Sequence, residues 1–259
     1  MCYAFDAQPP DLPVGGGAFS TTSLTLQSAD GTAFSAYLAR PAVPNGAAVV
    51  VLPDVRGLFR FYEELAERFA AVGITSIAFD YFGRTAGVGT RDAEFDFMPH
   101  VKQTQFDTVS ADVAAAIAAL RAESAVAGDK IFTVGFCFGG GHSFLQATTG
   151  QGLAGVVGFY GQVGVARFGA PAPTEMADSF ACPVLGLFGG DDPGIPAVAV
   201  AQFDAALAGA GVPHEIVSYP GAPHSFFDRK QEQFGAESAD AWRRILDFIK
   251  QPARQPVGV

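Results

Sequence analysis

Short apolar runs alternate with amphipathic segments along most of this chain. The apolar runs are rich in β-branched residues, which is typical of buried strands, and apolar residues at helical spacing follow them. Strands are predicted at residues 47–54, 74–83, 130–137, 153–161, 183–190 and 214–221. Helices are predicted at residues 61–73, 109–128, 138–150, 196–211 and 238–250, and Ser110 or Asp112 is the expected cap of the second helix.

The start of the chain follows a different pattern. Residues 1–20 contain three prolines and one run of three glycines at close spacing and predict an irregular arm. Residues 23–41 predict two short strands joined by a turn at Asp30-Gly31, a common hairpin dipeptide. Residues 84–99 fit neither the strand nor the helix pattern.

Strands that alternate with helices imply right-handed crossovers between parallel strands. The sequence therefore predicts an α/β fold: a mainly parallel central sheet, helices on both faces and antiparallel strands at the N-terminal edge. No repeat or linker interrupts the pattern, so residues 21–259 are expected to form a single domain. In such sheets, binding sites lie beyond the carboxyl ends of the strands.

Composition narrows the possible partners and the compartment. The chain has 259 residues, 49% of them hydrophobic, and its net charge of −10 comes with no cluster of basic residues. Nucleic acids and anionic membranes are therefore not expected as partners. No uninterrupted apolar run approaches about 18 residues, and no signal peptide is evident. The three cysteines, Cys2, Cys137 and Cys182, suggest neither a disulfide framework nor a metal site, so a cytoplasmic protein is expected.

The motif with the clearest chemistry is Gly135-Phe136-Cys137-Phe138-Gly139, between a predicted strand and a predicted helix. This is the pattern of a nucleophile elbow with cysteine in place of serine, and no Gly-X-Ser-X-Gly occurs elsewhere. The N-terminus of the helix would favour the thiolate and a developing oxyanion. Taken alone, the motif is equally compatible with a small buried cysteine at a glycine-rich turn.

Candidate acid and base residues follow Cys137 in the chain order of an α/β-hydrolase triad. Asp191 and Asp192 come directly after one predicted strand, and His224 comes after the last. Each could be an ordinary loop residue, but together, in that order and at strand ends, they predict a catalytic triad. Three further histidines are weaker candidates for the base: His100, His142 and His214.

The stretches GFCFGG, LFGGDDPGIP and PGAPHSFF together resemble the dienelactone hydrolase family, over about residues 20 to 250. The resemblance implies the α/β-hydrolase fold. It also implies that Cys137 is the nucleophile, that Asp192 rather than Asp191 is the acid, and that His224 is the base. The backbone N–H groups of Val55 and Phe138 would form the oxyanion hole.

The resemblance also implies residues around the triad. Asp54 stands where the family has a carboxylate, usually Glu, that contacts the resting thiol. Arg84 matches one of two family arginines that bind a substrate carboxylate. The other family position is Asp228 here, with Arg229 one residue further on, and Tyr160 matches a position near the site.

The function expected from these residues is a cysteine-dependent hydrolase of esters or lactones, most simply dienelactone-like enol-lactones that bear a carboxylate. The partner is then a small molecule, and no metal or organic cofactor is implied. Two alternatives remain open: a general carboxylesterase or thioesterase on the same scaffold, and a non-catalytic binding module. No feature of the sequence indicates an oligomeric state.

Overall fold

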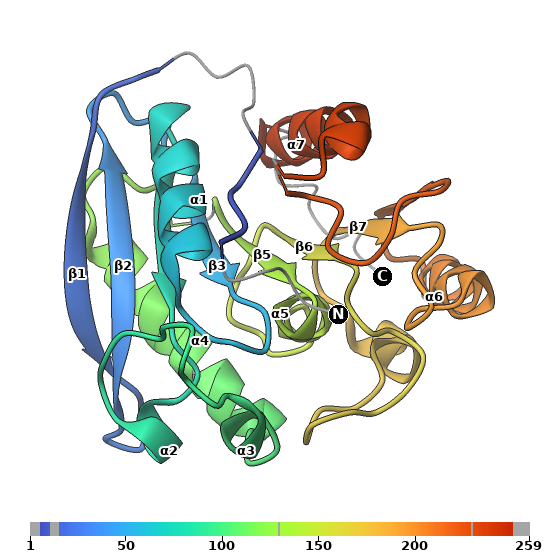
Figure 1. The fold of residues 1–259 in the computed structure, drawn as a ribbon, viewed down its shortest axis with the longest axis horizontal. Coiled ribbons are helices and arrows are strands. Elements are labelled where there is room, and N and C mark those ends of the chain that lie inside the picture. The colour runs from blue at the N-terminus through green and yellow to red at the C-terminus, as the bar shows by residue number, and fades with distance from the viewer. Residues whose placement is uncertain (1–5, 11–15, 129, 229, 251–259) are drawn as a thin grey trace.

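The computed structural model describes residues 6–10, 16–128, 130–228 and 230–250, and an eight-stranded sheet runs through it (Figure 1). The strand order is β1-β2-β4-β3-β5-β6-β7-β8. The strands are β1 (Phe19–Gln27), β2 (Ala33–Pro41), β3 (Ala48–Leu52), β4 (Thr75–Phe79), β5 (Ile131–Phe136), β6 (Gly155–Phe159), β7 (Val184–Gly189) and β8 (His214–Tyr219). Strand β1 pairs antiparallel with β2, and β2 pairs antiparallel with β4. All other pairings are parallel, which confirms the predicted antiparallel N-terminal edge.

Helices cover both faces of this sheet. They are α1 (Arg60–Ala71), α2 (Gly83–Ala86), α3 (Met98–Val101), α4 (Phe106–Ala122), α5 (Phe138–Gln146), α6 (Ala197–Gly209) and α7 (Gly235–Lys250), with 3-10 turns η1 (Pro173–Ser179) and η2 (Glu232–Phe234). Strand β3 shows the two faces directly. Val49 and Val51 pack into the core that contains α1, whereas Val50 packs into the core that contains α4. Because side chains alternate along a strand, α1 and α4 lie on opposite faces.

The structure differs from the sequence-based expectation at the start of α4. The helix begins at Phe106, and Gln105 is its N-cap in a reciprocal capping box with Thr108. The expected caps, Ser110 and Asp112, were wrong, because both lie inside the helix. Residues 84–99, expected to be irregular, contribute part of α2 and the start of α3. Among the helices of the described residues, none combines the length and the hydropathy of a membrane-spanning segment.

Candidate active site

Cys137 occupies a sharp turn between β5 and α5. Its backbone angles are φ 55° and ψ −110°, a region that a residue with a Cβ rarely adopts. Its N–H donates a hydrogen bond to Phe159 O (3.0 Å), and its own carbonyl accepts from Gly140 N–H (3.1 Å) and Gly141 N–H (3.2 Å). The surrounding structure thus holds the strained conformation, and the side chain is only partly buried.

Close backbone packing explains the glycines of the motif. A Cβ at Gly135 would lie 1.9 Å from Gly139 O, and a Cβ at Gly139 would lie 2.2 Å from Leu52 O. Neither position can hold a side chain without moving the backbone next to it. The Gly-X-Cys-X-Gly spacing therefore lets α5 start directly against the ends of β3 and β5, with Cys137 at its N-cap.

Asp192 and His224 meet on the loops that follow β7 and β8. Asp192 Oδ2 lies 2.5 Å from His224 Nδ1, and Asp192 Oδ1 accepts a hydrogen bond from Gly194 N–H (2.8 Å). The neighbouring Asp191 is exposed. Burial works against ionisation of the Asp192 carboxyl, but the hydrogen bond from His224, its charge and the Gly194 N–H outweigh burial, so the pKa of Asp192 lies below its usual value. Asp192 is therefore the ionised partner that orients one nitrogen of His224.

Backbone strain gathers around these residues. Among the described residues other than glycine, four have positive φ: Cys137 (55°), Tyr160 (34°), Phe168 (48°) and Ser225 (61°). Three of them line one cavity, and Ser225 follows His224 directly. Strained backbone persists where neighbouring structure enforces it, and it is common at functional sites. The strain thus marks the same place as the triad candidates.

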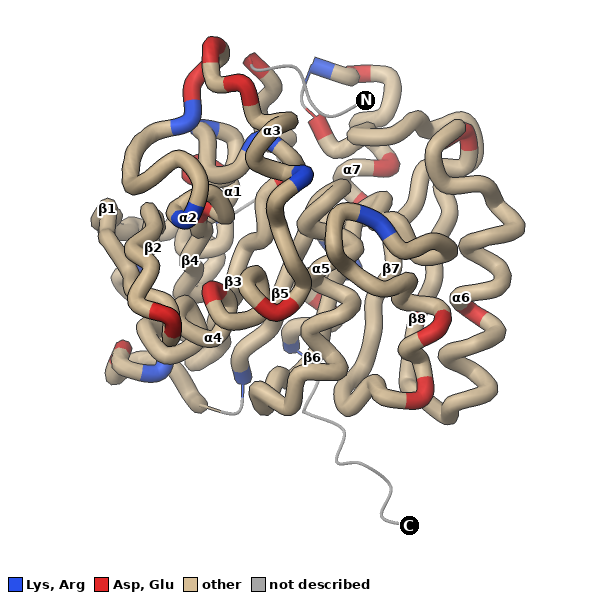
Figure 2. The backbone as a smooth tube through the Cα atoms, turned by 90° about the horizontal axis from the view of Figure 1, so that it is seen from below, with Lys and Arg blue, Asp and Glu red and all other residues tan. Residues whose placement is uncertain are grey.

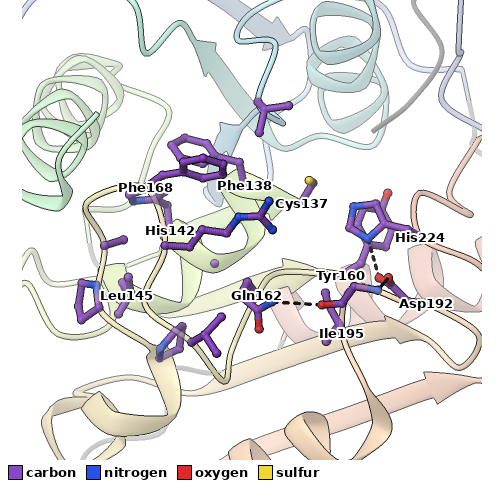
Figure 3. Close-up of a pocket in the computed structure, with 18 of the residues that line it drawn as sticks. Cys137, Phe138, His142, Leu145, Tyr160, Gln162, Phe168, Asp192, Ile195 and His224 are labelled. Carbon is purple, nitrogen blue, oxygen red and sulfur yellow. Dashed lines mark hydrogen bonds and ion pairs between the residues drawn. The ribbon is translucent and has the colours of Figure 1, made fainter. Parts of the chain in front are cut away.

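The cavity has a volume of about 670 Å³ and lies at the carboxyl ends of the parallel strands. Cys137, Asp192 and His224 all line it. Figure 3 shows Cys137 between two groups of side chains: Phe138, Phe168 and His142 on one side, and Tyr160, Asp192 and His224 on the other. The rest of the wall is mainly apolar: Val55, Phe97, Met98, Gly141, Leu145, Gln162, Val165, Arg167, Ala170, Pro171, Pro173, Pro193, Gly194 and Ile195.

The expected oxyanion donors lie at this cavity. Val55 and Phe138 both line it, and Phe138 is the first residue of α5, where a backbone N–H has no acceptor within the helix. Tyr160 also lines it, fully buried, with its ring 4.9 Å from that of His224. The arrangement can hold a thiolate, a base and an oxyanion around one carbonyl carbon.

Asp54 is fully buried beside Val55, and the structure gives it a partner that the sequence did not suggest. Both of its carboxylate oxygens accept hydrogen bonds from the guanidinium of Arg56 (3.2 and 2.6 Å), and Arg56 N–H donates to Oδ1 (2.9 Å). The Arg56 guanidinium in turn lies 4.2 Å over the ring of Phe59. The contact between Asp54 and the thiol stays a prediction.

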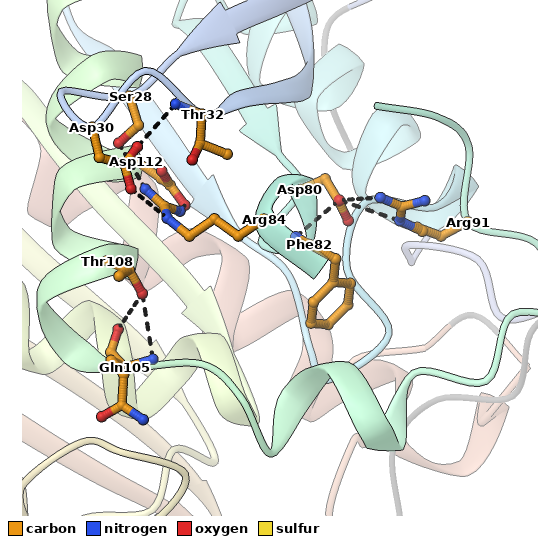
Figure 4. A network of polar contacts seen from close by, with 10 residues as sticks. All are labelled: Ser28, Asp30, Thr32, Asp80, Phe82, Arg84, Arg91, Gln105, Thr108 and Asp112. Carbon is orange, nitrogen blue, oxygen red and sulfur yellow. Dashed lines mark hydrogen bonds and ion pairs between the residues drawn. The ribbon is translucent and has the colours of Figure 1, made fainter. Parts of the chain in front are cut away.

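The structure does not bring Arg84 to the cavity. Its guanidinium binds Asp30 (2.8 Å), Asp112 (2.6 Å) and the Ser28 hydroxyl (3.0 Å) instead (Figure 4). The reason is local: the short α2 directs the side chain toward the β1–β2 turn and α4. Each of the three guanidinium nitrogens of Arg84 thus donates a hydrogen bond to a protein group rather than to a ligand in the cavity. Arg229 lies outside the described residues.

Sequence reasoning missed two polar residues of the cavity wall, Arg167 and Gln162, both in the loop after β6. The family resemblance pointed to Tyr160 but not to residues further along this loop. His142, considered only as a base, is 2% exposed, and neither ring nitrogen has a hydrogen-bond partner among the described residues. Burial lowers the pKa of His142 to about 3, so the ring is neutral at ordinary pH.

A mostly parallel sheet, a strand–helix elbow and an acid–histidine pair on the last loops define the α/β-hydrolase fold. Residues 34–253 match the model of the dienelactone hydrolase family, and the chain belongs to this family of hydrolases. The described residues contain no group of three or more His, Cys, Asp or Glu side chains that could hold a metal ion.

Individual relatives agree with the family match. A Salmonella typhimurium protein named "Putative carboxymethylenebutenolidase" is 30% identical over 249 residues, 92% of this chain and 89% of that protein. A Bradyrhizobium protein named "Probable 2-oxo-3-(5-oxofuran-2-ylidene)propanoate lactonase" is 29% identical and covers 83% of this chain and 88% of its own length. The crystal structure titled "Putative Dienelactone Hydrolase" from Klebsiella pneumoniae is 28% identical, with a TM-score of 0.79 over 91% of this chain and all of that one.

Proposed function

We propose that this protein hydrolyses lactones or esters through a thioester on Cys137, with Asp192 and His224 completing the triad. The observation that carries the proposal is the 2.5 Å contact between Asp192 and His224 in the same cavity as a strained elbow cysteine. The absence of any Gly-X-Ser-X-Gly motif in the chain leaves no serine elbow to compete.

Each residue of the site has a defined role in this mechanism. Asp192 accepts a hydrogen bond from the Nδ1–H of His224, which leaves Nε2 free to take the thiol proton as Sγ attacks the acyl carbon. The Phe138 and Val55 N–H groups stabilise the oxyanion of the tetrahedral intermediate. When the intermediate collapses, the leaving oxygen takes the proton back from His224. Water, deprotonated by His224, then attacks the thioester and releases the acid and the thiol.

Leaving-group chemistry favours enol-lactones among the possible substrates. In a tetrahedral intermediate on cysteine, the thiolate competes with the leaving oxygen for departure, so an alkoxide leaves poorly. An enolate leaves more easily and keeps the reaction moving forward. The name of the Bradyrhizobium relative, a lactonase, supports this class. The mainly apolar cavity wall favours one other function, a carboxylesterase or thioesterase for uncharged acyl groups.

The proposal is tested by kcat/KM for an enol-lactone and for p-nitrophenyl hexanoate. Cys137→Ala should lower both by about 10⁴-fold or more, because the covalent route is lost. Cys182→Ala is the matched control: Cys182 is buried, and burial raises its pKa to about 12, so it holds no reactive thiolate. A Cys137→Ala variant as active as the Cys182→Ala variant would refute the mechanism. Hydrolysis of the ester but not of the lactone would favour the esterase function.

A further inference from the structure

The cavity wall carries one positive charge among the described residues that line it, and this charge belongs to Arg167. The only carboxylate in that wall, Asp192, is committed to His224. The chain as a whole has a net charge of −10, and Figure 2 shows acidic positions scattered over its surface loops and helices. A single cation in an apolar cavity of an acidic protein is a specific place for an anion.

The backbone that presents Arg167 is a tight two-residue turn. Arg167 N–H donates to Ala170 O and Ala170 N–H donates to Arg167 O, each at 3.0 Å. The two residues between them have positive φ, 48° at Phe168 and 70° at Gly169, as in a type I′ turn. Such a turn normally takes Asn, Asp or Gly at its first central position, so a phenylalanine there is unusual and strained.

Contacts with the segment before α4 hold this turn in place. Phe106 N–H donates to Gly169 O (3.1 Å), and the Thr104 hydroxyl lies 3.4 Å from Phe168 O. A Cβ at Gly169 would lie 2.4 Å from Thr104 O, so the two backbones are packed as closely as glycine allows. The turn is therefore fixed before any ligand arrives, which reduces the entropy lost on binding.

The strained phenylalanine positions the charge. The Arg167 guanidinium lies 4.7 Å over the Phe168 ring, and that ring lies 6.2 Å from the ring of Phe138, the residue after the nucleophile. In Figure 3, Phe168 and Phe138 form the wall on the far side of Cys137 from His224. A substrate whose carbonyl is at Cys137 can thus extend along this aromatic wall toward Arg167.

We propose that Arg167 binds a carboxylate on the acyl part of the substrate and makes the enzyme selective for anionic acyl groups. This inference rests on the proposed function, because it places the acyl carbon at Cys137. The planar guanidinium matches a carboxylate with two parallel hydrogen bonds. Arg84 cannot take this role without giving up Asp30, Asp112 and Ser28.

Matched ester pairs test the inference. The probes are the mono-p-nitrophenyl esters of adipic, pimelic and suberic acid, each paired with the p-nitrophenyl alkanoate in which a methyl group replaces the carboxylate. The three acids differ in chain length, so that in at least one of them the carboxylate can reach Arg167 while the ester carbonyl lies at Cys137. In at least one pair, Arg167→Gln should lower the ratio of kcat/KM, anionic over neutral, by about tenfold, the low end for a charged hydrogen bond because Arg167 is exposed. Arg167→Lys keeps the charge but not the planar guanidinium, so its ratio should lie between those of wild type and Arg167→Gln.

Two control variants, Arg60→Gln and Arg84→Gln, make the result specific to Arg167. Arg60→Gln removes the same charge from an exposed position on α1 that does not line the cavity. It should leave the ratio within about twofold of wild type, since solvent and salt screen an exposed charge. An unchanged ratio in Arg167→Gln at every chain length, or an equal fall in Arg60→Gln or Arg84→Gln, would overturn the inference. Failure of the proposed function has a different signature: neither ester of a pair would respond to Cys137→Ala.

Discussion

Asp191 and Asp192 are adjacent and chemically identical, yet the structure gives them different environments. The Asp192 side chain is 2% exposed and bonded to His224, whereas Asp191 is exposed. Asp192→Asn should therefore lower kcat/KM by about 10²- to 10⁴-fold, because an amide does not hold the histidine in the required tautomer. The measurement is kcat/KM for both single variants on one ester.

Asp191→Asn is the matched control for that comparison, since it removes one negative charge at the neighbouring position. It should retain activity close to wild type. If Asp191→Asn lost the activity and Asp192→Asn kept it, the assignment of the acid would have to be reversed.

His142 links the cavity wall to the pH dependence of stability. Burial lowers its pKa from 6.5 to about 3, so at pH 5 the unfolded chain binds a proton here that the folded chain does not. The state that binds more protons is favoured as the pH falls, so unfolding becomes easier between pH 6.5 and about 3. From pH 7 to pH 5 this one group should remove about 2 kcal/mol from the free energy of unfolding.

Urea denaturation at the two pH values, for wild type and His142→Leu, isolates this contribution. Leucine keeps an apolar wall and cannot titrate, so the variant should lose about 2 kcal/mol less than wild type on going to pH 5. Equal losses in the two proteins would mean that His142 is protonated in the folded state at pH 5.

At the scale of the elements, the position of α5 depends on glycines that touch the sheet. A Cβ at Gly140 would lie 2.5 Å from Phe159 O and 2.9 Å from Gly161 Cα. Gly140→Ala should therefore destabilise the fold by about 1–3 kcal/mol through overpacking and should displace the elbow. Thermal unfolding and kcat/KM are the measurements.

Gly209, the last residue of α6, is the control because nothing lies within 4 Å of a Cβ built there. Gly209→Ala should leave activity unchanged and should stabilise the helix by up to about 1 kcal/mol. A Gly140→Ala variant as stable and active as Gly209→Ala would show that α5 has room to move.

The elements that the pattern predicted well are those with strong periodicity. The buried strands lie close to their expected positions because burial on both faces of a parallel sheet leaves a continuous apolar run. Helix α1 also lies close to its expected position, because its apolar residues recur at helical spacing. The start of α4 was misplaced since Gln105 is a weak N-cap by type and acts here through its partnership with Thr108. Ser110 and Asp112 are better caps by type but lie inside the helix, where Asp112 binds Arg84.

For the whole molecule, chain order and strand-end positions predicted Cys137, Asp192 and His224 as a triad. All three line one cavity, and their catalytic roles stay a prediction. The roles of the arginines could not be predicted in the same way. The environment of Arg84 is made by Asp30 on a hairpin turn and Asp112 on a helix, which only the tertiary structure brings side by side. Arg167 stands in a loop without periodicity, and its turn uses a phenylalanine where turn rules expect Asn, Asp or Gly.

The central claim is a covalent thioester on Cys137, and acid-quenched mass spectrometry tests it most directly. The protein is mixed with excess p-nitrophenyl hexanoate, quenched in acid during the first turnover, and its intact mass is measured before peptide mapping. The account predicts a gain of one hexanoyl group on the peptide that contains Cys137, and no gain in Cys137→Ala. A hexanoyl group on any other residue, or the same gain in Cys137→Ala, would contradict it.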